Sequence, residues 1–511
     1  MTHEETITAA AATTPANSAT APLNGALFNS ALLRPLVSLI AAVLAAMIFA
    51  TAPGSAIALV YALPLGVLAL EQHKKGWNNE SALIFVLALL SVIAIFIEPS
   101  AMNMVTGFCF TAATGLTMRG IRPSDGLKLL RHVAVMALSS PLMLAIDAVM
   151  ARVILKSARI SIDFRHVVVP LATVLLFGSL LVVANPILAA TAASLDRWLA
   201  NWIGFPFARL SAVQIFFVFP ATLALSWSLL RSRAVIAETA PIVTPAAWHQ
   251  ALFRPASIAF TLLTLNAMFL IENVLDLNHI WLKAALPPNM THAEYVHRGS
   301  YTLIVTVILA AIFIMVALRP GTATNASRTI RQLVYVFALQ NLFLVLSSAK
   351  RTLSYIDAYG MSEWRLAGLI WMGLVAFGLG LTVWRIVKDR DNRWLINGNL
   401  VAAALVVLAC GLLDFRPFIA RWNVDQALAS GTHYLFDARY NGAMLGVTAY
   451  PALAYYRGKL AEANFPGSPQ YAQRTDTISR LDEEMAGLRL YHQKTQSDWR
   501  SWTFRHWLME L

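Results

Sequence analysis

The sequence predicts an all-α membrane protein, a polytopic transmembrane helix bundle of about eleven spans with a small helical extramembrane domain at its C-terminal end. Three observations predict this fold class. Hydrophobic residues make up 58% of the 511 residues, and charged residues only 13%. Apolar runs recur along the chain, and a bilayer core about 30 Å thick needs about 20 apolar residues per helix. Most Lys and Arg residues gather in the short stretches between these runs.

The net charge and the two cysteines exclude some binding partners and some kinds of site. The formal net charge is +12, but the basic residues lie in short loops between apolar runs, as the positive-inside rule describes. We therefore expect the lipid bilayer as a partner and no nucleic acid. Cys109 and Cys410 both lie in apolar runs, so they predict neither a disulfide framework nor a thiolate metal site. No cofactor is predicted.

The chain divides into three predicted parts. Residues 1–31, rich in Ala and Thr and poor in charge, form a disordered N-terminal tail. Residues 32–413 form the transmembrane helical domain, and residues 414–511 form a helical C-terminal domain. The apolar runs that we interpret as spans are Leu32–Ala50, Ser55–Leu70, Ala82–Ile97, Ala101–Met118, Val167–Leu188, Leu210–Leu230, Ser257–Leu275, Tyr301–Leu318, Gln332–Ser347, Leu366–Trp384 and Leu395–Leu413.

One further run, Val133–Met150, is long enough to cross the membrane, but it contains Pro141 and Asp147 and has basic residues on both flanks. A true span should separate a loop rich in Lys and Arg from a poor one. If the run does not span, cytoplasmic loops hold 21 Lys and Arg against seven on the opposite side, leaving the C-terminal domain aside. We therefore expect this run to dip into or lie on the cytoplasmic face of a bacterial inner membrane, with the N-terminus cytoplasmic.

The C-terminal domain is then periplasmic, with Gly431 and Pro466-Gly467-Ser468-Pro469 as turn signals. Its last helix places Trp499 and Trp502 on one face, and either lies on the membrane surface or packs against the rest of the domain. The predicted helices are Val424–Ala429, Tyr434–Leu445, Pro451–Ala463, Thr475–His492 and Asp498–Met509.

The densest polar pattern in the sequence lies between the ninth and tenth predicted spans. Arg351, Tyr355 and Tyr359 recur every four residues and would share one helical face. Gly360 is predicted to break that helix, and Ser362 to cap the next one, whose first turn carries an acidic residue.

On the predicted topology this basic, aromatic corner lies on the side that should be poor in Lys and Arg. Binding of an anionic lipid or small molecule would explain the exception. The candidate ligand-binding residues are Lys350, Arg351, Tyr355, Asp357, Tyr359 and Arg365. In the alternative interpretation the two cations reach the membrane interface, the tyrosines lie in the aromatic belt and the aspartate pairs with an arginine.

The same corner carries a family resemblance. Its pattern is Ser348-Ala349-x-Arg351-x3-Tyr355-x2-Ala358-Tyr359-Gly360-Met361-Ser362-x2-Arg365, and Asn423–Leu428 and Asp498–Trp502 accompany it. These residues resemble an uncharacterised family of bacterial polytopic inner-membrane proteins, catalogued as a domain of unknown function (4153/4173 type). Met361 stands where a leucine is expected. The resemblance is clear over about the last 170 residues. It implies an inner-membrane protein, and neither a substrate nor a reaction.

A second candidate site lies at the outer end of the span Ser257–Leu275. Its acidic and imidazole side chains lie at positions i, i+4 and i+7 and would share one helical face, where they could bind a metal or relay protons. The spacing matches no defined zinc motif, and a hydrated helix end is the alternative. The candidate metal ligands are Glu272, Asp276 and His279, followed by His292, Glu294 and His297 in the next loop.

Several polar side chains fall inside predicted spans. They either line a substrate path or form hydrogen bonds with neighbouring helices. They are Asn185, Asn266, Asn273, Gln340 and Asn341.

The sequence contains no phosphate-binding Gly-rich loop, nucleophile elbow or zinc-protease motif. It therefore favours a non-enzymatic envelope protein, a transport component or a sensor, that binds an anionic or amphipathic ligand at the basic corner. The alternative is a membrane-embedded transferase acting on a lipid-linked substrate, with Glu98 or the Glu272/Asp276 pair as the required carboxylate. A structural partner of another membrane protein is the third hypothesis.

Overall fold

The computed structural model describes residues 26–121, 126–157, 211, 213–231, 255–282, 327–431, 436–462 and 469–509. Over these ranges the chain is helical and contains no strand, so the all-α class is confirmed. The described ranges contain seven helices long and apolar enough to cross a membrane, and two shorter apolar helices, Leu33–Ile48 and Gln214–Leu230. The predicted spans Val167–Leu188 and Tyr301–Leu318 lie outside the described residues.

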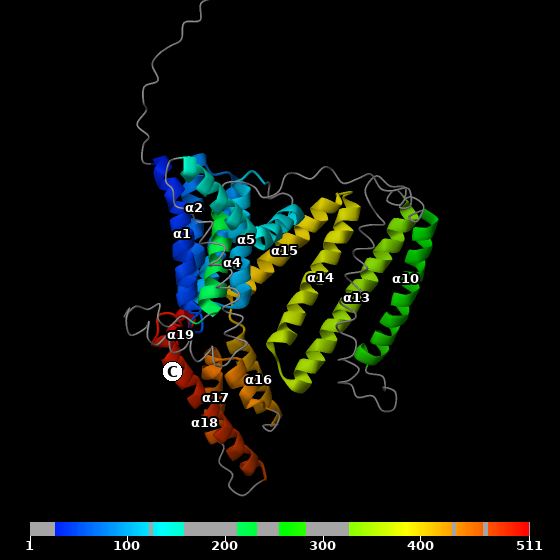
Figure 1. Cartoon of the computed structure of the whole chain (residues 1–511). Coiled ribbons are helices and arrows are strands. Elements are labelled where there is room, and N and C mark those ends of the chain that lie inside the picture. The colour runs from blue at the N-terminus through cyan, green and yellow to red at the C-terminus, as the bar shows by residue number, and fades with distance from the viewer. Residues whose placement is uncertain are drawn as a thin grey trace, which may run out of the picture.

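One group of helices, which we call the first lobe, packs side by side in Figure 1. Small residues allow the close packing, because Ala41, Ala88 and Ala112 are fully buried and let helix backbones approach each other. α1 begins at Ala26, within the segment predicted as a tail. The lobe consists of α1 (Ala26–Ile48), α2 (Ala58–Lys75), α3 (Asn79–Ile97), α4 (Ala101–Thr117) and α8 (Phe219–Leu230), which follows the short π-helix η3 (Gln214–Val218).

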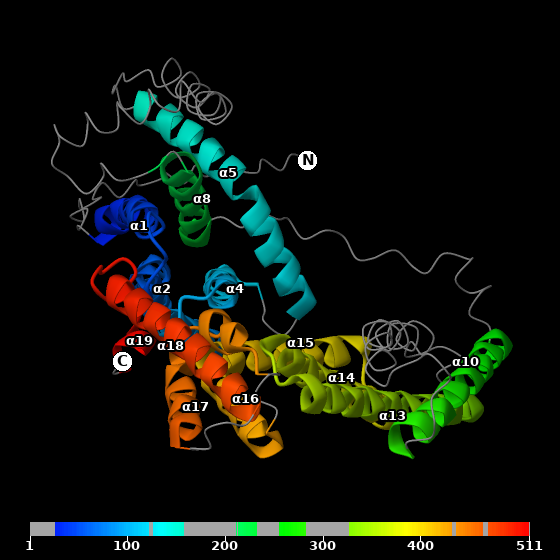
Figure 2. The same ribbon diagram turned by 90° about the horizontal axis from the view of Figure 1, so that it is seen from below.

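α5 (Gly126–Ser157) contains the ambiguous run and runs across the first lobe, whereas α1, α2 and α4 run along it (Figures 1 and 2). Asp147, the acidic residue in that run, pairs with Arg231 just after α8, with its Oδ1 2.9 Å from Nη2. Leu138 and Leu142 lie one turn apart and are exposed. By length and composition alone, Gly126–Val149 could still cross a membrane.

The second lobe consists of α10 (Pro255–Asp276), the π-helix η4 (Leu277–Trp281), α13 (Arg328–Tyr359) and α14 (Glu363–Val387). α13 lies between α10 and α14 (Figure 1). Asn266 Nδ2 donates to the carbonyl of Leu333 at 3.1 Å, and Gln340 Nε2 donates to Asn266 Oδ1 at 2.9 Å. Asn266 and Gln340 therefore form hydrogen bonds between α10 and α13, which is the interpretation of polar residues in spans as links between neighbouring helices.

α15 (Asn392–Leu412) connects the lobes, because it packs on α14 and also on α3, α4 and α5. α14 and α15 are close together at the upper end of Figure 1 and diverge toward the lower end. The C-terminal helices lie at that lower end. They are α16 (Arg416–Ser430), η6 (Tyr440–Met444), η7 (Val447–Ala449), α17 (Tyr450–Glu462), α18 (Pro469–Gln496) and α19 (Phe504–Trp507).

The core of these C-terminal helices includes the turn between α13 and α14. Val424, Leu453 and Leu481 are fully buried, and they belong to the same apolar cluster as Ile356 and Met361. The corner between the ninth and tenth predicted spans is therefore the place where the second lobe and the C-terminal helices share a core.

The predicted helix Asp498–Met509 is wrong, because only Phe504–Trp507 is helical. The preceding backbone bonds to the turn between α1 and α2 instead. The amides of Gly54 and Ser55 donate to the carbonyls of Arg500 and Trp502, both at 2.7 Å. A Cβ at Gly54 would collide with the Trp502 carbonyl oxygen, so the close approach needs glycine.

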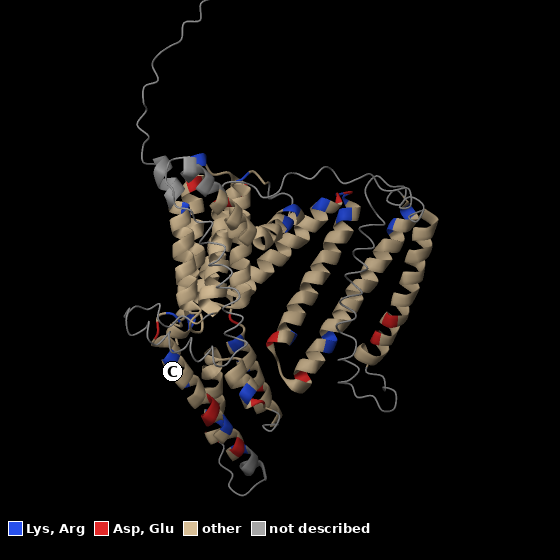
Figure 3. Cartoon of the chain, viewed as in Figure 1, with Lys and Arg blue, Asp and Glu red and all other residues tan. Residues whose placement is uncertain are grey.

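Basic residues lie at the end of the helix bundle opposite the C-terminal helices. Figure 3 shows basic residues at the upper ends of α13, α14 and α15, near the turn that joins α14 to α15. The turn between α13 and α14 and the C-terminal helices lie at the opposite end (Figure 1).

Candidate functional site

The local structure of the corner between α13 and α14 follows its sequence. α13 ends at Tyr359, and Gly360 has φ +76°, a conformation that favours glycine. The Ser362 hydroxyl accepts a hydrogen bond from the Arg365 amide at 3.4 Å, with Glu363 in the first turn of α14. The break, the cap and the first-turn acid are confirmed.

The two candidate sites predicted separately meet at Arg351. This arginine on α13 is 3% exposed and forms an ion pair with Asp276 at the end of α10, which is 0% exposed. Its Nη2 also lies 3.7 Å from Glu272 Oε1. A buried cation needs such partners, because desolvating an unpaired charge is costly.

The other residues of the corner form contacts among themselves. The Lys350 ammonium lies 4.3 Å from the ring centroid of Trp281, and the rings of Tyr355 and Tyr359 lie 4.7 Å apart. The Arg365 guanidinium lies 4.4 Å from the Tyr355 ring centroid and donates to the Tyr359 carbonyl at 3.0 Å. These contacts test neither interpretation of the corner, and its ligand-binding role stays a prediction.

The aspartate of the corner, Asp357, is exposed near the end of α13, and its carbonyl accepts a hydrogen bond from Gln426 of α16. Asn423, also on α16, accepts from the Met361 amide at 2.6 Å and donates to the Met361 carbonyl at 3.0 Å. α16 therefore binds the backbone of the corner directly.

The metal prediction concerned Glu272, Asp276 and His279. Asp276 and Glu272 face Arg351, and His279 lies in η4, where the wider π-helical turn changes the spacing of side chains from that of an α-helix. Within the described ranges, no three His, Cys, Asp or Glu side chains lie together as a metal site requires. His292, Glu294 and His297 lie outside those ranges, so a metal role stays a prediction.

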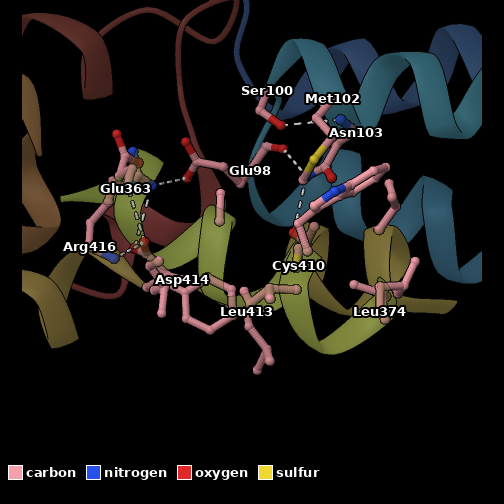
Figure 4. A pocket seen from close by; sticks show the side chains of 18 of the residues that line it. Glu98, Ser100, Met102, Asn103, Glu363, Leu374, Cys410, Leu413, Asp414 and Arg416 are labelled. Atoms are coloured by element: carbon pink, nitrogen blue, oxygen red, sulfur yellow. Dashed lines mark hydrogen bonds and ion pairs between the residues drawn. The ribbon is translucent and has the colours of Figure 1, made fainter. Parts of the chain in front are cut away.

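A cavity of about 440 Å³ lies where α14 and α15 diverge, with the beginning of α4 as its third wall. Its walls are mostly apolar and its end toward the C-terminal helices is charged (Figure 4). The apolar side chains include Met102, Leu366, Ile370, Trp371, Leu374 and Val407, and the charged ones are Glu98, Glu363, Asp414, Arg416 and Arg505.

Four of the charged side chains form a closed ring in which each contacts two of opposite sign. Arg416 lies 3.0 Å from Glu98 and 2.9 Å from Asp414. Arg505 lies 3.2 Å from Glu98 and 3.1 Å from Asp414. The side chains are 10% to 21% exposed, so the ring is partly accessible. We call it the four-charge ring.

Contacts within the ring shift the pKa values of Asp414 and Arg416. Burial by itself raises the pKa of Asp414, but hydrogen bonds and the charge of Arg416, with the charge of Arg505, bring that pKa below its ordinary value. Burial lowers the pKa of Arg416, but Glu98 and Asp414 more than offset this, so the pKa is raised. Both shifts favour the charged forms of Asp414 and Arg416. The ring pairs two carboxylates with two guanidinium groups, so these charges sum to zero.

Sequence reasoning missed this arrangement. Glu98 was singled out only as a substitute acid for a transferase, and Arg505 was only one position of the predicted helix Asp498–Met509. Asp414 and Arg416 directly follow the last apolar run, a position that could have drawn attention to them. No local signal connects these residues, because they come from three separate parts of the chain.

Comparison with known proteins identifies one family. The model described as "Domain of unknown function (DUF4153)" matches residues 82–456. No curated protein and no solved structure matches the chain. The matched range includes the corner, Asn423–Leu428 and most of the cavity, whereas Asp498–Trp502 and Arg505 lie beyond it. Because the match covers more than half of the chain, this all-helical protein with membrane-length apolar helices belongs to the DUF4153 family.

Proposed function

We propose that this protein is a non-enzymatic protein of the bacterial inner membrane, a transport component or an envelope sensor, that binds an amphipathic ligand in the cavity between α4, α14 and α15. One observation carries the proposal, the division of the cavity into apolar walls and a charged end. Its volume of about 440 Å³ lies within the range of about 300–1,000 Å³ typical of small-molecule sites.

The expected position of α14 in the bilayer supports this proposal. Trp364 and Trp384 are exposed near its two ends. Twenty residues of helix separate them, which corresponds to about 30 Å, the thickness of the hydrocarbon core. Tryptophan favours the membrane interface, so the cavity residues 363–374 of α14 would lie in the leaflet next to the C-terminal helices.

The exposure of the cavity walls suggests how a ligand enters. Met102, Trp371 and Val407 line the cavity, yet each is 38% to 46% exposed. In a bilayer such exposed apolar surfaces would face lipid. We therefore propose that the ligand enters sideways from the membrane, with its apolar part between α14 and α15 and its polar end beside the four-charge ring.

The proposal includes a topology of eleven spans, with a cytoplasmic N-terminus, a periplasmic C-terminal domain over residues 414–511, and Val133–Met150 on the cytoplasmic face. The clustering of basic residues at the end of the bundle opposite the C-terminal helices supports this orientation. The cavity then opens toward the periplasmic leaflet. The basic corner lies beside its charged end, because α14 begins there.

The test is the number of phospholipids retained by the detergent-purified full chain, counted by native mass spectrometry. Ala403→Phe places a phenyl ring in the cavity, and Ala409→Phe is the matched control on the same helix, because Ala409 is exposed and does not line the cavity. We expect at least about tenfold weaker retention in the Ala403→Phe variant, equivalent to about 1.4 kcal/mol. Equal retention in both variants would contradict the proposal.

The rival proposal is a transferase acting on a lipid-linked substrate, and the presence of Glu98 in the cavity favours it. Glu98→Gln tests this more cleanly than Asp276→Asn, because the latter also breaks the buried pair with Arg351. A transferase would change the mass of a lipid-linked donor supplied in vesicles and lose this activity in Glu98→Gln. A binding protein leaves the donor unchanged in both forms.

A further inference from the structure

We propose that the cavity prefers lipids whose headgroup carries a primary ammonium group, with Glu363 as the counterion of that ammonium. This inference rests on the proposed function, since it names the class of headgroup that the same cavity would accept. It follows from a count of the charges around the polar end of the cavity and from the partners that each charge has.

The four-charge ring offers little attraction to an anionic headgroup. Each of its arginines already contacts both Glu98 and Asp414 at 2.9 to 3.2 Å. A phosphate that approached either arginine would have to compete with two carboxylates of the protein. The ring as a whole is neutral, so it also exerts no net long-range attraction on an anion.

Glu363 is the remaining charged residue of the cavity lining. It stands on α14, is exposed, and forms no ion pair with any described residue. Its backbone is fixed, because its amide donates to the hydroxyl of Tyr440 at 2.9 Å. Nearby Arg365 is directed to the Tyr355 ring and to the Tyr359 carbonyl instead.

The polar end of the cavity therefore carries a net charge of −1, from three carboxylates and two guanidinium groups. The N-terminus of α14 offsets part of this charge, since a helix dipole is equivalent to about half a positive charge at that end. Among the lining residues, the Glu363 carboxylate is left without a cation, and it favours a cationic group beside an apolar chain. A phospholipid with an ethanolamine headgroup combines both features.

The experiment uses the full chain reconstituted in vesicles that contain equal amounts of phosphatidylethanolamine and phosphatidylglycerol with identical acyl chains. The protein is extracted into detergent, and native mass spectrometry gives the ratio of the two bound lipids. We expect about a fivefold preference for phosphatidylethanolamine, which is the discrimination that one partly screened ion pair provides.

Glu363→Gln should bring this ratio close to one, and Glu363→Lys should invert it in favour of phosphatidylglycerol. The matched control is Glu483→Gln, because Glu483 is an exposed carboxylate on α18 away from the cavity, and this variant should keep the wild-type ratio. Glu363 is exposed, so its replacement should not prevent folding.

A wild-type ratio near one, a preference for phosphatidylglycerol, or a ratio that Glu363→Lys leaves unchanged would overturn the inference. Failure of the proposed function has a different signature. In that case the wild type retains neither lipid, or the Ala403→Phe variant retains both as well as the wild type does. If the cavity binds both lipids but does not discriminate between their headgroups, only the assignment of the headgroup is overturned.

Discussion

Two ionic clusters lie toward the same end of the helix bundle, and their surroundings differ. Arg351 and Asp276 are 3% and 0% exposed and face each other between α13 and α10. The four side chains of the four-charge ring are 10% to 21% exposed and border a cavity with apolar walls. The first cluster is buried in the contact between two helices, whereas the second lies where a ligand could reach it.

The difference shows why an unusual charge is an ambiguous signal in a membrane protein. A buried ion needs a partner within the protein whether or not a ligand binds, because its desolvation must be offset. Arg351 was singled out because it breaks the positive-inside pattern on the predicted topology, and its partner is a carboxylate on the neighbouring helix. The four-charge ring differs from the Arg351–Asp276 pair because it borders a cavity that a ligand could enter. Whether a charged group borders a cavity depends on the tertiary structure.

The largest expected effect tests the buried cluster. Arg351→Ala leaves Asp276 buried without its cation, which should cost about 3–5 kcal/mol of stability and lower the temperature at which the purified protein unfolds in detergent. The double variant Arg351→Met, Asp276→Leu should recover most of this loss, because it removes both charges. If Arg351→Ala is as stable as the wild type, the pair is not buried between α10 and α13 as described.

A smaller effect is expected from the four-charge ring. Arg505→Ala removes contacts with Glu98 and Asp414 and a hydrogen bond to the Leu412 carbonyl at 3.3 Å. Water can reach the remaining groups, so the cost should be about 1.5–3 kcal/mol, a range typical of hydrogen bonds to charged groups.

This loss should fall on the terminal segment, and limited proteolysis of residues 497–509 measures it. Arg489→Ala on α18 serves as the control, since Arg489 does not line the cavity. If Arg505→Ala destabilises the whole chain as strongly as Arg351→Ala, then the two clusters do not differ as proposed.

The smallest effect is a dependence of terminal-segment docking on pH. His506 lies in this segment, with the His492 ring 6.3 Å away, and the charges of Glu98, Asp414 and Arg416 act on it. Burial lowers the pKa of His506 below its ordinary value of 6.5. The undocked segment then binds more protons, so docking is most stable above pH 6.5 and weakens as the pH falls below it.

Asp414 acts in the same direction in a more acidic range. Its pKa lies below the ordinary value of 3.8, so its contribution to stability is present above that pH and is lost as the pH falls through the lowered pKa. Proteolysis of the terminal segment should therefore accelerate between pH 7 and pH 5, and His506→Gln should flatten that dependence. A rate that does not change with pH in the wild type would exclude the histidine contribution.

The sequence by itself determined the class of the protein and much of its local structure. Apolar runs and their lengths predicted most of the described helices to within a few residues, since burial in lipid requires that pattern. Gly360 and Ser362 predicted the break and the cap at the corner, because both effects depend on residues only a few positions apart. The family resemblance at this corner is likewise confirmed.

Only the tertiary structure decided which charges meet. Arg351 and Asp276 are 75 residues apart, and the four-charge ring joins residues near positions 98, 415 and 505. The terminal segment illustrates the same limit, because a sequence with helical periodicity instead bonds its backbone to Gly54 and Ser55. Periodicity and hydropathy are local properties, whereas the pairing of side chains depends on which helix faces which, and that is set by the packing of the whole chain.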